Sequence, residues 1–115
     1  MIDLHSHTLH SDGDRTPAQL FAEAKAAGVE VLAVTDHDTV FGLEECRVAS
    51  EAAGVRLVTG IELSCELHGR EVHVLGHFID PRAPALELGE AQLRRVVPTK
   101  NSVLAVLVEV IGVCE

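Results

Sequence analysis

The alternation of strand-like and helix-like segments over residues 1–80 is the feature that most restricts the fold of this chain. Residues 29–35 form a mostly apolar run rich in β-branched side chains, which is typical of a strand buried on both faces of a parallel sheet. Residues 2–7 and 55–61 are the neighbouring strand patterns, and a helical pattern separates each of them from this run. The order predicts an α/β fold with parallel strands.

Both predicted helices have boundaries that can be read from the sequence. Thr16 can cap the first helix, Pro17 suits its first turn, and Gln19 completes a capping box. The second helix is predicted over residues 39–53, where apolar side chains recur near the helical period and Gly54 follows.

The remaining residues form a predicted hairpin and a tail. Residues 66–77 predict a short β-hairpin, so that the element order becomes βαβαββ. Beyond it, residues 83–97 suit a helix, whereas residues 102–113 could form either a buried helix or a strand. We therefore expect one domain portion over the first 80 residues and a divergent helical or apolar tail over residues 81–115.

Charge and composition exclude several classes of function. The net charge of −9, without a basic block, argues against strong non-specific binding to nucleic acid or to anionic membranes. A phosphorylated small molecule or nucleotide remains a suitable partner if metal ions supply the positive charge. The apolar stretch 103–108 is too short to span a membrane, and the early strand leaves no room for a signal peptide. The three cysteines lack CxxC spacing, which indicates reduced thiols in a cytoplasmic protein.

Imidazole and carboxylate groups follow the first predicted strand. His5 and His7 lie two residues apart, a spacing that puts both rings on one face of a strand and can chelate one metal ion. The alternative to metal binding is that His5 and His7 are ordinary polar residues of a strand. Asp12 follows in a turn, where an aspartate before glycine is also ordinary turn chemistry.

Similar groups end the later strands. His37 lies between Asp36 and Asp38; a helix cap explains Asp38, but His37 looks like a metal ligand with outer carboxylates. Glu62 directly follows the third predicted strand, and His73 interrupts the apolar return strand of the hairpin. For His73 the alternative is a half-exposed strand histidine.

The carboxyl ends of neighbouring parallel strands meet at one edge, so these groups are expected to converge there. Mixed imidazole and carboxylate ligands suit zinc, manganese or iron, and more ligands than one ion needs indicate two or three ions. His10 in a loop, His68 at the hairpin tip and His77 beyond the return strand are interpreted as structural or solvent-facing.

Four motifs in this order resemble the PHP (polymerase and histidinol phosphatase) family: Leu4-His5-Ser6-His7-Thr8 with Ser11-Asp12-Gly13, Thr35-Asp36-His37-Asp38-Thr39, Gly60-Ile61-Glu62-Leu63-Ser64, and Val72-His73-Val74-Leu75-Gly76. The resemblance is strongest to small bacterial members that hydrolyse nucleotide phosphates or short RNA ends. It implies a distorted seven-stranded α/β barrel with two or three divalent ions (Mn, Zn, Fe or Mg) at the carboxyl ends of its strands.

The resemblance also implies a role for each motif residue. The metal ligands it assigns are His5 and His7 on a first ion, Glu62 as the bridging carboxylate, His73 on a second ion, and Asp12 and His37 on a third. Glu62 and His37 are the residues expected to act in catalysis. The ions would activate water for attack on phosphorus and neutralise the phosphate oxygens, so that no side-chain nucleophile is needed.

Two departures from the family pattern lead to a narrower expectation. The further Asp and His ligands of a C-terminal segment are absent from the 115 residues, and the family's Arg-rich helix is represented only by Arg94 and Arg95. We therefore expect the N-terminal portion of a barrel, either truncated or changed in reading frame near residue 96, with an incomplete catalytic set and a tendency to self-associate. A metal-binding module without turnover and an amide hydrolase or deacetylase are the alternatives.

Overall fold

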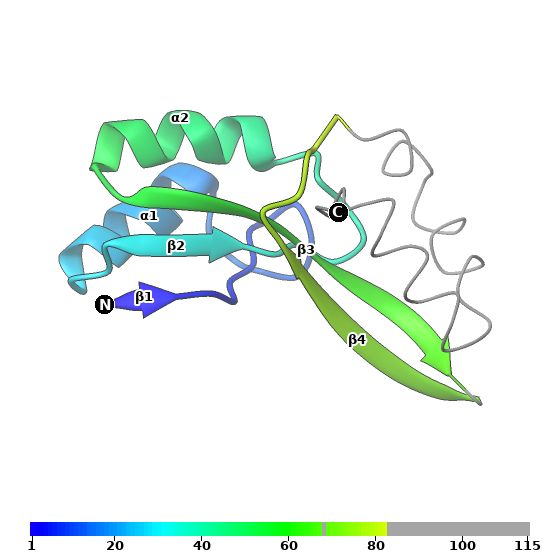
Figure 1. Cartoon of the computed structure of the whole chain (residues 1–115). Helices are drawn as coiled ribbons and strands as arrows, with labels where there is room; N and C mark the ends of the chain where they lie inside the picture. Colours follow the sequence, from blue (N-terminus) through cyan, green and yellow to red (C-terminus); the bar gives the residue numbers. More distant parts are fainter. Residues whose placement is uncertain (68, 83–115) are drawn as a thin grey trace, which may run out of the picture.

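The computed structural model describes residues 1–67 and 69–82, so the predictions for His68 and for the tail lie outside the described residues. The elements are β1 (Ile2–Asp3), α1 (Pro17–Ala26), β2 (Val31–Val34), α2 (Leu43–Ala53), β3 (Arg56–Leu67) and β4 (Arg70–His77). The sheet has the strand order β1-β2-β3-β4; its first three strands are parallel, and β4 is antiparallel to β3. The α/β fold is thereby confirmed. Figure 1 shows the two helices packed beside each other on the sheet, and the β3–β4 hairpin curling away from it.

The capping box of α1 forms as predicted. The Thr16 hydroxyl accepts a hydrogen bond from the Gln19 backbone N–H at 3.2 Å, and the Gln19 side chain accepts one from the Thr16 backbone N–H at 3.0 Å. Pro17 occupies the first turn, where its missing N–H costs nothing. Phe21, one turn further on, is fully buried in the core between the helices and the sheet.

The predicted start of the second helix is wrong by several residues. α2 begins at Leu43 after Gly42, which provides no side-chain cap. Asp38 does not cap this helix; its backbone N–H donates to the Glu62 carbonyl at 3.0 Å, and its Oδ1 accepts from the Ser64 N–H at 2.8 Å. Because Asp38 is tied to β3 in this way, the chain needs additional residues before it reaches the helix layer. The end of α2 at a left-handed Gly54 is confirmed.

The first strand is shorter than predicted and ends at Asp3. The Asp3 carboxylate accepts from the His5 N–H at 3.1 Å, which gives that N–H a local partner. Beyond it, the Ser6 hydroxyl donates to the Ala33 carbonyl at 2.6 Å, and the Thr35 N–H donates to the Ser6 carbonyl at 2.8 Å. His5 and His7 therefore lie on an extended connection beside β2 and not on a regular strand.

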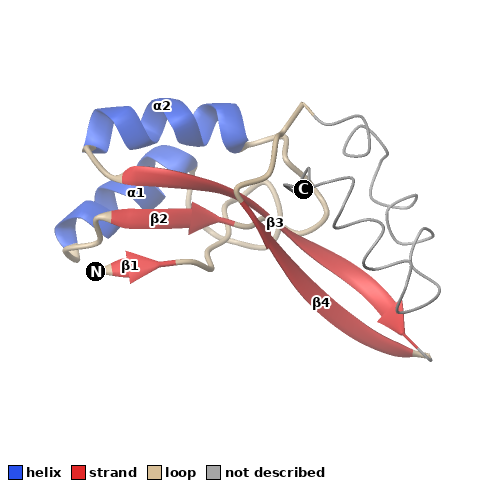
Figure 2. Ribbon diagram, viewed as in Figure 1, coloured by secondary structure: helices blue, strands red, loops and turns tan. Residues whose placement is uncertain are grey.

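The third strand is longer than predicted, because β4 gives it a new partner where β2 ends (Figure 2). It pairs with β2 over residues 56–59 and with β4 over residues 60–67. Gly60 stands at the change of partner, where a Cβ would lie 2.6 Å from Thr35 Cγ2 and 2.9 Å from the Val34 carbonyl. Glu62 consequently lies inside the strand and not after its end. In the described part of the chain, no helix is long and apolar enough to cross a membrane.

Candidate metal centre

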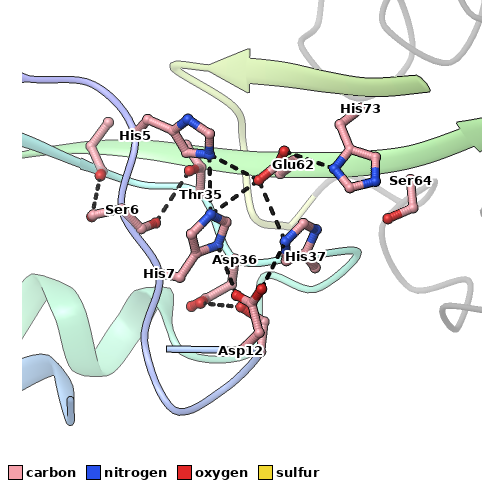
Figure 3. Close-up of polar contacts among 12 residues, drawn as sticks. His5, Ser6, His7, Asp12, Thr35, Asp36, His37, Glu62, Ser64 and His73 are labelled. Carbon is pink, nitrogen blue, oxygen red and sulfur yellow. Dashed lines mark hydrogen bonds and ion pairs between the residues drawn. The ribbon is translucent and has the colours of Figure 1, made fainter. Parts of the chain in front are cut away.

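The predicted candidates come from four parts of the chain and converge beyond the carboxyl ends of β1 and β2 (Figure 3). The connection after β1 supplies three of them, the segment after β2 one, and β3 and β4 one each. The structure brings together all the side chains assigned as ligands from the sequence, namely His5, His7, Asp12, His37, Glu62 and His73.

Glu62 lies at the middle of this cluster, and its two carboxylate oxygens face different histidines. Oε2 is 2.9 Å from His5 Nε2, 3.1 Å from His7 Nε2 and 3.6 Å from His37 Nε2. Oε1 is 3.1 Å from His73 Nδ1. The residue is only 5% exposed, so its charge is compensated by these neighbours and not by bulk water. The Glu62 carboxylate therefore contacts two different groups of potential ligands, one through each oxygen.

The cluster divides into three overlapping sets whose ligand atoms lie within 4.8 Å of one another: His5, His7 and Glu62; His7, Asp12 and His37; and His37, Glu62 and His73. Asp12 Oδ2 is 3.2 Å from His37 Nε2, and Asp12 Oδ1 is 3.5 Å from His7 Nδ1. The rings of His7 and His37 stack with centroids 4.6 Å apart. Because each set shares members with another, the cluster is continuous.

The donor atoms have the spacing and chemistry that a divalent cation requires. The edges of the triangle formed by the Glu62, His5 and His7 donor atoms measure 2.9, 3.1 and 3.1 Å. Ligands bonded at about 2.0–2.2 Å and at near right angles around one ion are separated by about 3 Å. In addition, His7 Nδ1 is buried and makes no hydrogen bond within the described residues, which is costly unless another partner satisfies it. The residues therefore fit a metal centre.

The histidines also set the ionisation of Glu62. Burial raises the pKa of this carboxyl, but the hydrogen bonds from His5 and His73 and the field of His37 outweigh it and hold the pKa below its usual 4.5. The pKa of His73 is raised above 6.5, first by its hydrogen bond to Glu71 and then by Glu62, against the opposing effect of burial. Glu62 is thus ionised at neutral pH.

Asp36 performs a function that the sequence reasoning missed. Its carboxylate is buried and accepts from the Thr8 N–H, the Thr8 hydroxyl and the Ser11 hydroxyl, each at 2.7 Å. These hydrogen bonds fix the loop that carries Asp12, whereas the sequence had suggested that Asp36 supports the His37 ring. The signal available beforehand was an acid directly after a buried strand.

His10 and His77, which were set aside as ligands, do not join the cluster. His10 Nε2 is 3.0 Å from Glu45 Oε2, and its ring contacts Phe41 with centroids 5.6 Å apart. His77 Nε2 lies 2.7 Å from the Leu4 carbonyl. Neither belongs to a ligand set among residues 1–67 and 69–82.

The sequence was compared with protein families and with individual proteins of known activity. The PHP domain family matches residues 3–107. A 5′-3′ exoribonuclease from Haemophilus influenzae is 41% identical over 95 residues, which cover 80% of this chain and 35% of that protein. A 3′,5′-nucleoside bisphosphate phosphatase from Chromobacterium violaceum is 40% identical over 93 residues, covering 81% of this chain and 33% of that protein.

A solved structure shows the same architecture. An amidohydrolase from Chromobacterium violaceum, with bound sulfate and no metal, superposes with a TM-score of 0.73 at 39% identity, covering 83% of this chain and 32% of that one. The described residues form a curled four-stranded half-barrel that corresponds to the N-terminal part of such barrels. The chain spans about a third of the length of the relatives it matches.

Proposed function

The chain belongs to the PHP domain family, and from that premise we propose that it supplies ligands of a divalent metal centre that hydrolyses phosphate esters. The observation that carries the proposal is the position of Glu62. Its two oxygens contact histidines of different ligand sets at 2.9–3.1 Å, which is the arrangement expected of a carboxylate that bridges two ions. The expected ions are two or three of manganese, zinc, iron or magnesium, since imidazole and carboxylate ligands suit them.

The ions would activate water, neutralise phosphate oxygens and stabilise the leaving oxygen. The chain's own residues would hold the ions and keep the ligand side chains in position. Glu62 fixes the spacing of the ligand sets, and His37 lies between them, within 3.2 Å of Asp12 and 3.6 Å of Glu62. Asp36 holds the Asp12 loop, and Asp38 ties the His37 segment to β3.

Other routes to hydrolysis have little support among the described residues. Cys46 is buried, and burial raises the pKa of its thiol to about 12, so it is not a nucleophile at neutral pH. Ser6 and Ser11 donate their hydroxyl protons to the Ala33 carbonyl and to Asp36. Within the described segments, the ion pairs of the six ligand candidates involve only histidine, aspartate and glutamate, so metal ions are the natural source of positive charge for a phosphate.

We infer nucleotides or short oligonucleotides as the substrate class. Support comes from the named activities of the relatives, an exoribonuclease and a nucleoside bisphosphate phosphatase, which both act on phosphate esters of nucleosides. A second candidate is amide hydrolysis, which the amidohydrolase with the same architecture favours. A metal-binding module without turnover is the alternative to both. An error-prone DNA polymerase of Mycobacterium tuberculosis is 42% identical over 64 residues, which are 6% of that protein, so a similar segment occurs in a protein named for a different activity.

The test is a substrate panel with the full chain in manganese. Adenosine 3′,5′-bisphosphate, a short 5′-phosphorylated RNA and an N-acetylated amide would be compared, with Glu62→Gln against the exposed control Glu51→Gln. We expect weak turnover of the phosphate esters, which E62Q abolishes and E51Q leaves unchanged. Turnover of the amide alone would replace the proposal by the second candidate, and tight metal binding with no turnover would favour the inert module.

A further inference from the structure

His77, the last residue of β4, contacts the segment that carries the first histidine pair. Its Nε2 lies 2.7 Å from the Leu4 carbonyl oxygen, and Leu4 directly precedes His5. The contact joins residues 73 positions apart and connects β4 with the residue directly after β1. A carbonyl oxygen only accepts, so His77 must donate through a protonated Nε2.

We propose that His77 is a positioning residue of the metal centre: its N–H holds the Leu4 carbonyl and thereby fixes the backbone from which His5 projects. The inference rests on the proposed metal function of His5. It gives a role to a histidine that belongs to none of the ligand sets.

The segment around His5 depends on such anchors because the regular strand has already ended. β1 stops at Asp3, and the next backbone groups are held one by one through side chains. Asp3 accepts from the His5 N–H at 3.1 Å, and the Ser6 hydroxyl donates to the Ala33 carbonyl at 2.6 Å. His77 holds the carbonyl that lies before them. Removing it would leave the chain just before His5 without this support.

His5 needs this support more than its neighbour does. Its side chain is 49% exposed, whereas that of His7 is 21% exposed. Packing therefore restricts the His5 ring less, and the position of its backbone contributes more to where Nε2 lies. A ligand that is not oriented in advance loses metal affinity because binding must then order it.

The strand geometry explains how β4 can serve the cluster at two points. His73 and His77 are four residues apart on β4, so their side chains leave the same face of the strand. His73 reaches Glu62, and His77 reaches Leu4. In the β3–β4 register His77 stands opposite Gly60, which has no side chain to compete for the space. β4 thus supplies a candidate ligand and, four residues further on, a backbone anchor.

The test is a double-mutant cycle of Co²⁺ affinity on the full chain, followed by the visible absorption of the bound ion. His77→Leu removes the donor, His77→Gln keeps an amide N–H near the same place, and both are made with His5 intact and in a His5→Ala background. Loss of one hydrogen bond predicts that H77L weakens binding about 3- to 10-fold, corresponding to roughly 0.6–1.4 kcal/mol. H77Q should stay close to the native affinity, and H77L should have no further effect in the H5A background.

Several results would overturn the inference. An equal loss from H77L with and without His5 would mean a purely structural role. A loss in H77Q as large as in H77L would mean that His77 is itself a ligand. Should H77L fail to fold, H77Q and the shorter His77→Asn, which cannot reach Leu4, provide the same comparison. A native chain that binds no cobalt would instead contradict the proposed function.

Discussion

At the scale of single residues, the site depends on buried acids that contact side-chain and backbone groups of the protein. Glu62 faces histidines, whereas Asp36 faces the N–H and hydroxyl groups of Thr8 and Ser11. A buried carboxylate with such donors is stabilising only while they are present, because its desolvation is otherwise uncompensated.

Asp36→Ala should lower the free energy of unfolding by about 3 kcal/mol, because it leaves the two buried donors of Thr8 and the half-buried hydroxyl of Ser11 without an acceptor. Asp36→Asn, which keeps the shape, should cost about 1–2 kcal/mol. Urea denaturation of the metal-free chain measures both. Asp14→Asn on the same loop is the control, since the Asp14 side chain is 87% exposed and should change stability by less than about 0.5 kcal/mol. Equal effects of D36A and D14N would show that Asp36 does not organise the loop.

The pKa shifts of Glu62 and His73 predict a pH dependence for the metal-free chain. Glu62 has a lowered pKa, so its stabilising effect is present above 4.5 and is lost as pH falls through the folded-state value. His73 has a raised pKa, so its effect is present below 6.5 and is lost as pH rises through the folded-state value. The melting temperature in EDTA should therefore decline above pH 6.5 in the native chain, and His73→Gln should reduce that decline. An unchanged profile in H73Q would contradict it.

The same His73 proton opposes metal binding, because a coordinating nitrogen must be unprotonated.

Five of the six ligand candidates could be selected from the sequence because each is a polar residue in or next to a strand pattern. Asp12 lies in a turn, and its assignment came from the resemblance to the PHP family. The task of Asp36 could not be predicted in the same way. Its partners lie 25 and 28 residues away, and an acid after a strand suits a cap or a turn equally well.

At the scale of elements, local signals were reliable where they act within a few residues. The capping box of α1 and the left-handed Gly54 after α2 depend on neighbours in sequence and formed as predicted. The end of β1 and the length of β3 depend on partners far along the chain. β3 continues because β4 pairs with it, and only the assembled sheet shows that Glu62 lies within a strand.

Gly60 marks the point at which β3 changes partner. A substitution there should affect both stability and metal binding, whereas one at Gly54 should affect stability alone. Gly60→Ala should destabilise the chain by about 1–3 kcal/mol and also disturb cobalt binding, because its Cβ would press on Thr35 and the Val34 carbonyl two residues before Glu62. Gly54→Ala is the matched control: it meets open space but has a left-handed φ of +69°, so it should cost about 1 kcal/mol and leave the cobalt spectrum unchanged. An unaltered spectrum in G60A would count against the close approach.

At the scale of the whole molecule, the described part is a half-barrel with apolar side chains left on its surface. Ile2 is 64% exposed, Leu4 45% and Phe78 70%, and β1 pairs with a single strand within the described sheet. An unpaired edge bordered by apolar groups is a template for association. Related proteins are about three times longer, and the chain matches only their N-terminal part.

We therefore expect the purified chain to self-associate. Size-exclusion chromatography with light scattering over a dilution series should give a mass above the 12.3 kDa of one chain, rising with concentration. Leu4→Ser should shift the series towards the monomer, whereas the exposed Val48→Ser on α2 should not. A monomer at every concentration would contradict the expectation.

The central claim is that Glu62 bridges metal ions among the clustered histidines. Anomalous diffraction at the zinc edge, from crystals of the chain grown with zinc, tests it most directly. The account predicts at least two peaks, one next to Glu62 Oε2 with His5 and His7 and another next to Glu62 Oε1 with His73, each about 2.0–2.2 Å from its ligand atoms. Peaks only at surface carboxylates such as Glu44 and Glu51, with none beside Glu62, would contradict it.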